Sequence, residues 1–267
     1  MHGQADFPQN PPTFAYREYT VKDKLLTDVV SVLLDQYKEI LGAWMQAAGN
    51  IISAIASTPT DRLSNSTQQN LNTFGLALQA AGNGLETEGQ GTPFSLEYIG
   101  NALGTIGVLE AFTAVIIEFP EETDTTLNIQ GNLLQAVGST IAAFDETQDT
   151  TTAGSLEGFI GNIIQTIGSV IQIMGIQVQA EGSQQNDNEQ NQTQNHNGHK
   201  GQDNQTGSYM KWNQQNGSKN EHQNNQSQQE GANLIAVGSW IQAIGAVIAA
   251  IGQQKEEMQE LQLGIDE

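Results

Sequence analysis

Few residues in this chain could do chemistry, and they are scattered. His196, His199 and His222 carry ring nitrogens that bind metals, but all three lie in one amide-rich segment that offers no fixed geometry. The acidic clusters at 121–124 and 145–149 lack the Asp-x-Asp-x-Asp-Gly order of an EF-hand loop, and acidic residues are expected at helix starts anyway. The sequence therefore predicts no metal site and no cofactor.

A catalytic nucleophile is equally hard to find. The chain has no cysteine, which excludes disulfides, thiolate zinc sites and a thiol nucleophile. We find no histidine or lysine beside a helical serine, and no glycine run with the strand and lysine that a phosphate-binding loop requires. We expect that the protein is not an enzyme, and we identify no small-molecule ligand.

The charge balance restricts the partners. Thirty acidic residues face nine basic ones among 267, a net charge of −21, although only 15% of the residues are charged. Nucleic acids and anionic membranes attract lysine and arginine, so we expect no nucleic-acid partner. The first residues have neither a basic region nor an apolar run, which favours a cytoplasmic location over secretion.

The chain is repetitive, and glycine marks the repeat. Six segments align on one pattern in which glycine recurs every seven residues, typical of helices that pack closely through small residues. Glycine inside a helix costs about 1 kcal/mol relative to alanine, so close packing should compensate for its use. Loose, weakly selected contacts are the alternative. The expected helix-packing seam contains Gly42, Gly49, Gly75, Gly82, Gly100, Gly107, Gly131, Gly138, Gly161, Gly168, Gly175, Gly238, Gly245 and Gly252.

Glutamine stands four residues after the first glycine in five of the six repeats. One interpretation is a solvated, helix-forming side chain. The other is a device that fixes register, in which the amides pair between neighbouring helices beside the glycines. The residues concerned are Gln46, Gln79, Gln135, Gln165 and Gln242.

The predicted fold is all-α, a bundle or repeat array of about six helices. Cap and breaker residues place these helices near 20–57, 66–88, 94–118, 125–145, 153–180 and 231–262. We divide the chain into an extended arm (1–19), five repeats (20–182), an insertion (183–230) and a sixth repeat with the C-terminal end (231–267). The insertion contains 24 asparagines and glutamines in 48 residues, a composition that predicts disorder.

Two uncharged stretches raise the question of a membrane. Leu234–Ile251 is just long enough to cross a bilayer, and Phe159–Val178 is uncharged but contains four amides. Basic flanks that would set an orientation are missing apart from Lys255. We therefore favour a buried bundle over membrane insertion, with Trp44 and Trp240 in its core or seams.

The repeated unit G-[NSA]-x-[LIM]-Q-[AT]-[AVI]-G, as in Gly131–Gly138 and Gly161–Gly168, resembles a family of repetitive, uncharacterised bacterial proteins of spore-forming Firmicutes. The resemblance covers roughly 35–180 and 230–255. It implies a bacterial, non-enzymatic protein and allows association with spores, and it supplies no binding residues.

The sequence is consistent with two functions. The leading hypothesis is a non-enzymatic helical-repeat protein with a structural or self-association role in a bacterium. The alternative is a membrane-active bundle that inserts its uncharged, glycine-rich helices 158–178 and 234–251.

Overall fold

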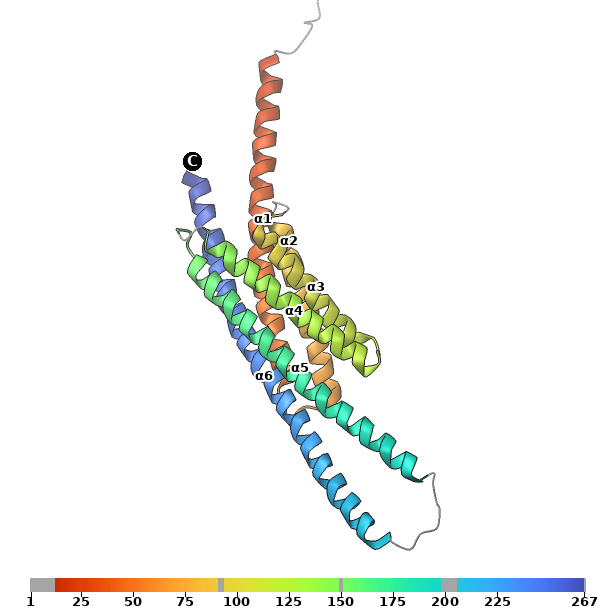
Figure 1. Ribbon diagram of the computed structural model, residues 1–267. Coiled ribbons are helices and arrows are strands. Elements are labelled where there is room, and N and C mark those ends of the chain that lie inside the picture. Colours follow the sequence, from red (N-terminus) through yellow and green to blue (C-terminus); the bar gives the residue numbers. More distant parts are fainter. Residues whose placement is uncertain (1–12, 91–93, 149–150, 198–205, 267) are drawn as a thin grey trace, which may run out of the picture.

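A computed structural model describes the backbone of residues 13–90, 94–148, 151–197 and 206–266 (Figure 1). These residues contain six helices and no strand, which confirms the all-α prediction. The helices are α1 (Thr13–Ser57), α2 (Asn65–Gly89), α3 (Leu96–Ile116), α4 (Glu121–Glu146), α5 (Ser155–Asn197) and α6 (Thr206–Asp266).

The six helices form a closed ring. Each helix packs against the next one along the chain, most extensively within the pairs α1–α2, α3–α4 and α5–α6, and α6 returns to pack against α1. Over the described residues, no backbone contact joins helices that are not neighbours in this ring. The arrangement therefore encloses an interior that all six helices share.

Local signals explain where the helices begin. The hydroxyl oxygen of Ser64 accepts a hydrogen bond from the backbone of Thr67 at the start of α2, and Ser95 does the same for Tyr98 at the start of α3. Helix α4 begins four residues earlier than predicted, directly after Pro120. Its first turn carries three acidic residues, which the partial positive charge of a helix N-terminus stabilises.

The amide-rich insertion is the largest difference from the predicted secondary structure. We expected disorder over 183–230, whereas α5 continues to Asn197 and α6 begins at Thr206, with residues 198–205 outside the described part. A helix already nucleated by packing gains one hydrogen bond for each residue added, so it can extend through a polar sequence. The expected arm also differs, since α1 begins at Thr13 and residues 1–12 are not described.

The distribution of side chains is inverted relative to a water-soluble bundle. The buried apolar residues are mostly alanines, and they share the interior with buried amides, serines and carboxyl groups. Large apolar side chains lie outside: Leu133 is 53% exposed, Ile244 is 54% exposed and Phe144 is 65% exposed. Trp44 and Trp240, expected in the core or seams, are 39% and 41% exposed and lie outside the core, and each donates a hydrogen bond across the contact between α1 and α6. Because glycine and alanine hold the helices close together, bulky side chains have no room at the helix contacts.

Candidate functional site: the polar interior

The predicted seam glycines lie at the helix contacts, where they face one another in antiparallel pairs. A methyl group added at Gly42 would lie 2.6 Å from the carbonyl oxygen of Gly82, and one added at Gly82 would lie 2.6 Å from that of Gly42. Such distances leave no room for a side chain, and facing backbones this close can make Cα–H···O contacts. The same reciprocal arrangement relates the pairs Gly49–Gly75, Gly100–Gly138, Gly107–Gly131, Gly161–Gly245 and Gly168–Gly238.

The structure adds two glycines that the sequence analysis missed. Gly175 faces Gly231, and Gly252 faces Gly154, so the seam between α5 and α6 continues beyond the repeat at both ends. Both missed residues follow the heptad, because Gly231 precedes Gly238 by seven residues and Gly154 precedes Gly161 by seven. Extending the repeat spacing by one heptad would have found them.

Two cavities occupy the interior, and residues from all six helices line each of them. The first, of about 220 Å³, contains acidic residues from four helices, and we call it the acidic cavity. The second, of about 770 Å³, lies at the other end of the ring and is lined mainly by amides, hydroxyls and small apolar residues. The interior is therefore hollow at both ends, which an ordinary close-packed helical core is not.

A layer of glutamines separates the two cavities. Gln46 of α1 donates to the amide oxygen of Gln165 of α5 at 3.4 Å, and Gln242 of α6 donates to that of Gln135 of α4 at 2.8 Å. Both hydrogen bonds connect helices that are not neighbours in the ring. These four residues, here called the amide layer, thus bridge the interior, whereas the sequence interpretation placed such pairs between neighbouring helices.

The fifth predicted glutamine has a different environment. Gln79 is 3% exposed and donates to the hydroxyl of Ser53 at 3.0 Å, a bond between the neighbouring helices α1 and α2. Gln79 lines the larger cavity. All five glutamines therefore point into the bundle, and none has the solvated position of the alternative interpretation.

A second polar position of the repeat also faces the interior, and the sequence analysis missed it. The residue after a seam glycine is often asparagine or serine, and in the structure these side chains line the cavities. The signal was present in the repeat, because Gly-Asn-x-x-Gln places both polar residues on one side of a helix. The residues are Asn50, Asn83, Asn101, Ser139, Asn132, Asn162 and Ser239.

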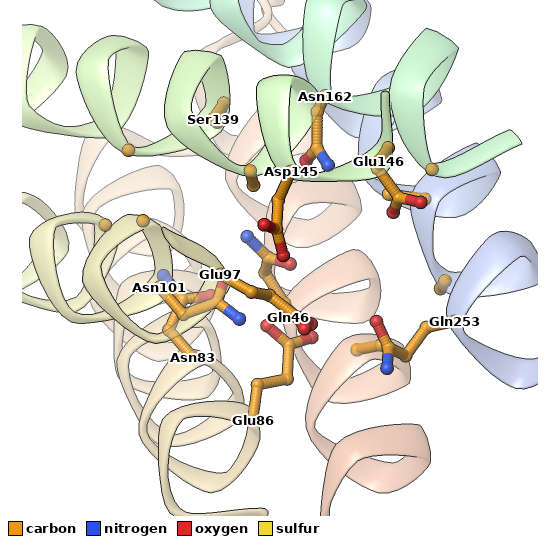
Figure 2. Close-up of a pocket in the computed structure, with 18 of the residues that line it drawn as sticks. Gln46, Asn83, Glu86, Glu97, Asn101, Ser139, Asp145, Glu146, Asn162 and Gln253 are labelled. Carbon is orange, nitrogen blue, oxygen red and sulfur yellow. The ribbon is translucent and has the colours of Figure 1, made fainter. Parts of the chain in front are cut away.

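The acidic cavity gathers carboxyl groups from α2, α3, α4 and α6. Figure 2 shows Glu86, Glu97 and Asp145 directed toward the same space beside the amide of Gln46. Burial raises the pKa of Glu86 to about 8, with a contribution from the charge of Glu97. Burial together with neighbouring acidic groups raises the pKa of Glu146 to about 8 as well. The cavity thus contains more carboxyl groups than its surroundings stabilise in the ionised form.

Basic side chains do not offset this charge. Among the described residues, no lysine, arginine or histidine lines the acidic cavity. The two nearby lysines are paired elsewhere: Lys38 contacts Asp35 and Glu88, each at 3.1 Å, and Lys255 pairs with Glu157. These ion pairs lie toward the surface, so neither lysine neutralises the carboxyl groups of the acidic cavity.

Direct metal binding finds no support in the described side chains, where no three histidine or acidic residues lie close enough together to hold a metal ion. His196, His199 and His222 fall outside the side chains that the structure describes.

Comparison with known proteins identifies a family and nothing more specific. Searches of the curated proteins and of the solved structures found no match to this chain. One family model, described as a family of unknown function (DUF6944), matches residues 37–218, which include five of the six glycine repeats. Because the match covers more than half of the chain, the protein belongs to the DUF6944 family.

Proposed function

We propose that this protein is a membrane-inserting helical bundle that encloses a polar interior. The observation that carries the proposal is the inverted distribution of side chains. Gln79, Gln165 and Asn83 are 2–3% exposed, whereas Leu133, Phe144 and Ile244 are more than half exposed. Apolar surface of this kind is costly in water and favourable against lipid chains, while enclosed amides such as Gln79 and Gln165 find hydrogen-bond partners inside.

The positions of the charged residues support the same arrangement. Each helix overlaps a stretch without charge, apart from Glu110 in α3, and charged residues flank each stretch. At least 18 residues of every stretch are helical, which corresponds to about 27 Å or more and is close to the thickness of the hydrocarbon core of a bilayer. The stretches are 40–60, 63–85, 98–117, 125–144, 158–180 and 231–254.

Contacts between helices place these stretches side by side. Gly42 faces Gly82 within the first pair of helices, and Gly161 faces Gly245 within the third. Between pairs, the Trp44 indole nitrogen donates to Gln254 at 3.1 Å. The uncharged stretches therefore overlap in one band around the ring, with acidic residues at both of its edges.

By length and composition, four helical segments among the described residues are long and apolar enough to cross a membrane: Leu26–Ser57, Leu96–Ile116, Ser155–Ser183 and Asn225–Leu263. Helices α2 and α4 are less apolar, but the glycine seams pack them against α1 and α3. Trp44 lies near one edge of its uncharged stretch, as expected for an aromatic residue at a membrane interface, whereas Trp240 is near the middle of its own stretch. The Trp240 indole nitrogen donates to Thr58 at 3.0 Å, close to the end of α1.

This proposal adopts the alternative from the sequence and extends it from two inserting helices to six. The leading hypothesis, self-association in water, would use the same apolar exterior as a contact between copies. The expectation that the protein is not an enzyme stays a prediction.

Flotation of the protein with liposomes distinguishes membrane insertion from self-association in water. Full-length protein mixed with phosphatidylcholine liposomes should rise with the lipid in a density gradient and resist extraction by alkaline carbonate. Protein that stays at the bottom as a soluble assembly at high micromolar concentration would favour self-association and contradict insertion.

A further inference from the structure

The two cavities and the amide layer follow one another along the interior of the ring. Gln46 lines the acidic cavity, while Gln135 and Gln242 line the larger cavity on the other side of the layer. In a membrane-inserted bundle this line runs from one side of the bilayer toward the other. The inference below therefore rests on the proposed function and concerns the solute that enters this interior.

The charge of the acidic cavity selects for cations. Glu86, Glu97, Asp145, Glu146 and Glu256 line it, and the lining includes no basic residue. Rings of carboxylates favour cations over anions at pore entrances, and low-dielectric walls strengthen that preference. The larger cavity also has acidic residues at its outer end, in the first turn of α4.

An unpartnered amide supplies evidence independent of the carboxylates. Asn83 is 2% exposed, and its side-chain oxygen has no hydrogen-bond partner among the described residues. The residue lines the acidic cavity next to Glu86 of the same helix (Figure 2). A buried carbonyl oxygen without a donor destabilises the fold unless a water or a cation contacts it.

The size of the cavity indicates how a cation would be held. A volume of about 220 Å³ has room for several water molecules. No three acidic side chains among the described residues converge closely enough to replace a full coordination shell. Contact through retained water fits this geometry better than direct chelation.

We propose that the acidic cavity binds a small inorganic cation with its water shell and forms the cation-selective entrance to the interior of the bundle. Asn83 and Gln46 offer amide oxygens to the bound water, and the carboxylates supply the charge. The amide layer lies directly beyond this cavity and is the narrow point that a cation would have to pass.

Ion flux through proteoliposomes tests this proposal. Full-length protein is reconstituted into phosphatidylcholine vesicles under a KCl gradient at about pH 9, where Glu86 and Glu146 are mostly ionised, and the permeability of K⁺ relative to Cl⁻ is measured. We expect K⁺ to be favoured by about tenfold or more, as for other carboxylate-lined entrances. Equal permeability, a preference for Cl⁻, or no flux from inserted protein would overturn the proposal.

Two neighbouring glutamates of α2 provide a matched pair of variants. Glu86→Gln removes a carboxylate of the acidic cavity and should reduce the K⁺ preference about threefold or more. Glu88→Gln removes a carboxylate that is 65% exposed and paired with Lys38, so it should leave the preference unchanged. Equal effects of the two variants would contradict a role of the cavity.

Insertion of the protein into the membrane and its selectivity for cations are measured in separate assays. Flotation and helical circular dichroism are measured on every sample, and Glu97→Gln serves as a second cavity variant if Glu86→Gln does not fold. Wild-type protein that fails to float contradicts the proposed function. Wild-type protein that floats without cation selectivity contradicts this inference alone.

Discussion

Gln242 of α6 donates a hydrogen bond of 2.8 Å to the side-chain oxygen of Gln135 on α4, across the interior of the bundle. The two helices are not neighbours in the ring, and their described backbones make no contact. Gln242 also accepts a hydrogen bond from Gln172 at 2.6 Å and donates to Ser169 at 3.1 Å. One glutamine thus links three side chains at the centre of the molecule.

Replacing Gln242 by leucine should destabilise the bundle, because partners of its amide would remain buried without a hydrogen bond. Each such group costs roughly 1–3 kcal/mol. The control is Gln130→Leu, at an exposed position of α4, where we expect little change. Urea unfolding in a mild detergent, followed by circular dichroism, measures the free energy of unfolding. Equal effects of the two substitutions would show that the central hydrogen bonds contribute nothing.

The glycine seam predicts opposite effects for two Gly→Ala substitutions. A methyl group at Gly168 would lie 2.6 Å from the backbone nitrogen of Gln242, so Gly168→Ala should force the helices apart and cost roughly 1–3 kcal/mol. Gly84 lies in α2 with nothing within 4 Å of an added methyl group. Gly84→Ala should therefore stabilise the protein by about 0.5–1 kcal/mol through helix propensity. The same unfolding assay measures both variants, and Gly168→Leu should be more damaging still. Stabilisation by Gly168→Ala would mean that the seam is loose.

Membrane insertion should be sensitive to charge within the uncharged band but not beyond it. Ile244 and Met258 are both on α6 and are 54% and 52% exposed, but Ile244 lies within the band and Met258 lies past its end. An aspartate within a transmembrane segment costs roughly 2.5–3.5 kcal/mol on insertion scales. We expect Ile244→Asp to reduce liposome flotation strongly and Met258→Asp to leave it near the wild-type level. If both variants float equally well, the exterior does not face lipid.

The acidic cavity predicts a protein that is more stable in acid than in base. The pKa values of Glu86 and Glu146 are about 8 in the folded protein, against an ordinary value of 4.5. The folded state therefore binds protons more tightly than the unfolded state. Stability should be greatest below about pH 4.5, should fall as the pH rises toward 8, and should level off above that.

Glu86→Gln tests the origin of this pH dependence. In this variant the free energy of unfolding should depend less steeply on pH, by the contribution of about one titrating proton. At pH 9 the variant should be more stable than the wild type by up to a few kcal/mol. Glu88→Gln, which alters an exposed, ion-paired carboxylate of the same helix, is the control. The free energy of unfolding at several pH values between 4 and 9 provides the comparison. A profile unchanged by Glu86→Gln would assign the dependence to other groups.

The sequence by itself determined the helical fold, the number of helices and the glycine pattern. These follow from local rules, since a seven-residue period and capping residues act within one helix. The repeat also carries the polar pattern, because Asn and Gln at one and four residues after a glycine share one side of a helix. The positions of the charged residues in the sequence also located the uncharged stretches. The sequence analysis interpreted these stretches as the buried parts of a bundle and not as membrane-spanning segments.

The tertiary structure decided which side of each helix faces inward. Trp44 and Leu133 are apolar enough for a core, yet they lie outside because the paired glycines bring the backbones too close for bulky side chains. The gathering of Glu86, Glu97 and Asp145 depends on three helices closing into a ring, and no spacing along the chain encodes that closure. The sequence located the glycines of the helix contacts, whereas the choice of which helices meet and the enclosed polar interior arise only when all six helices are assembled.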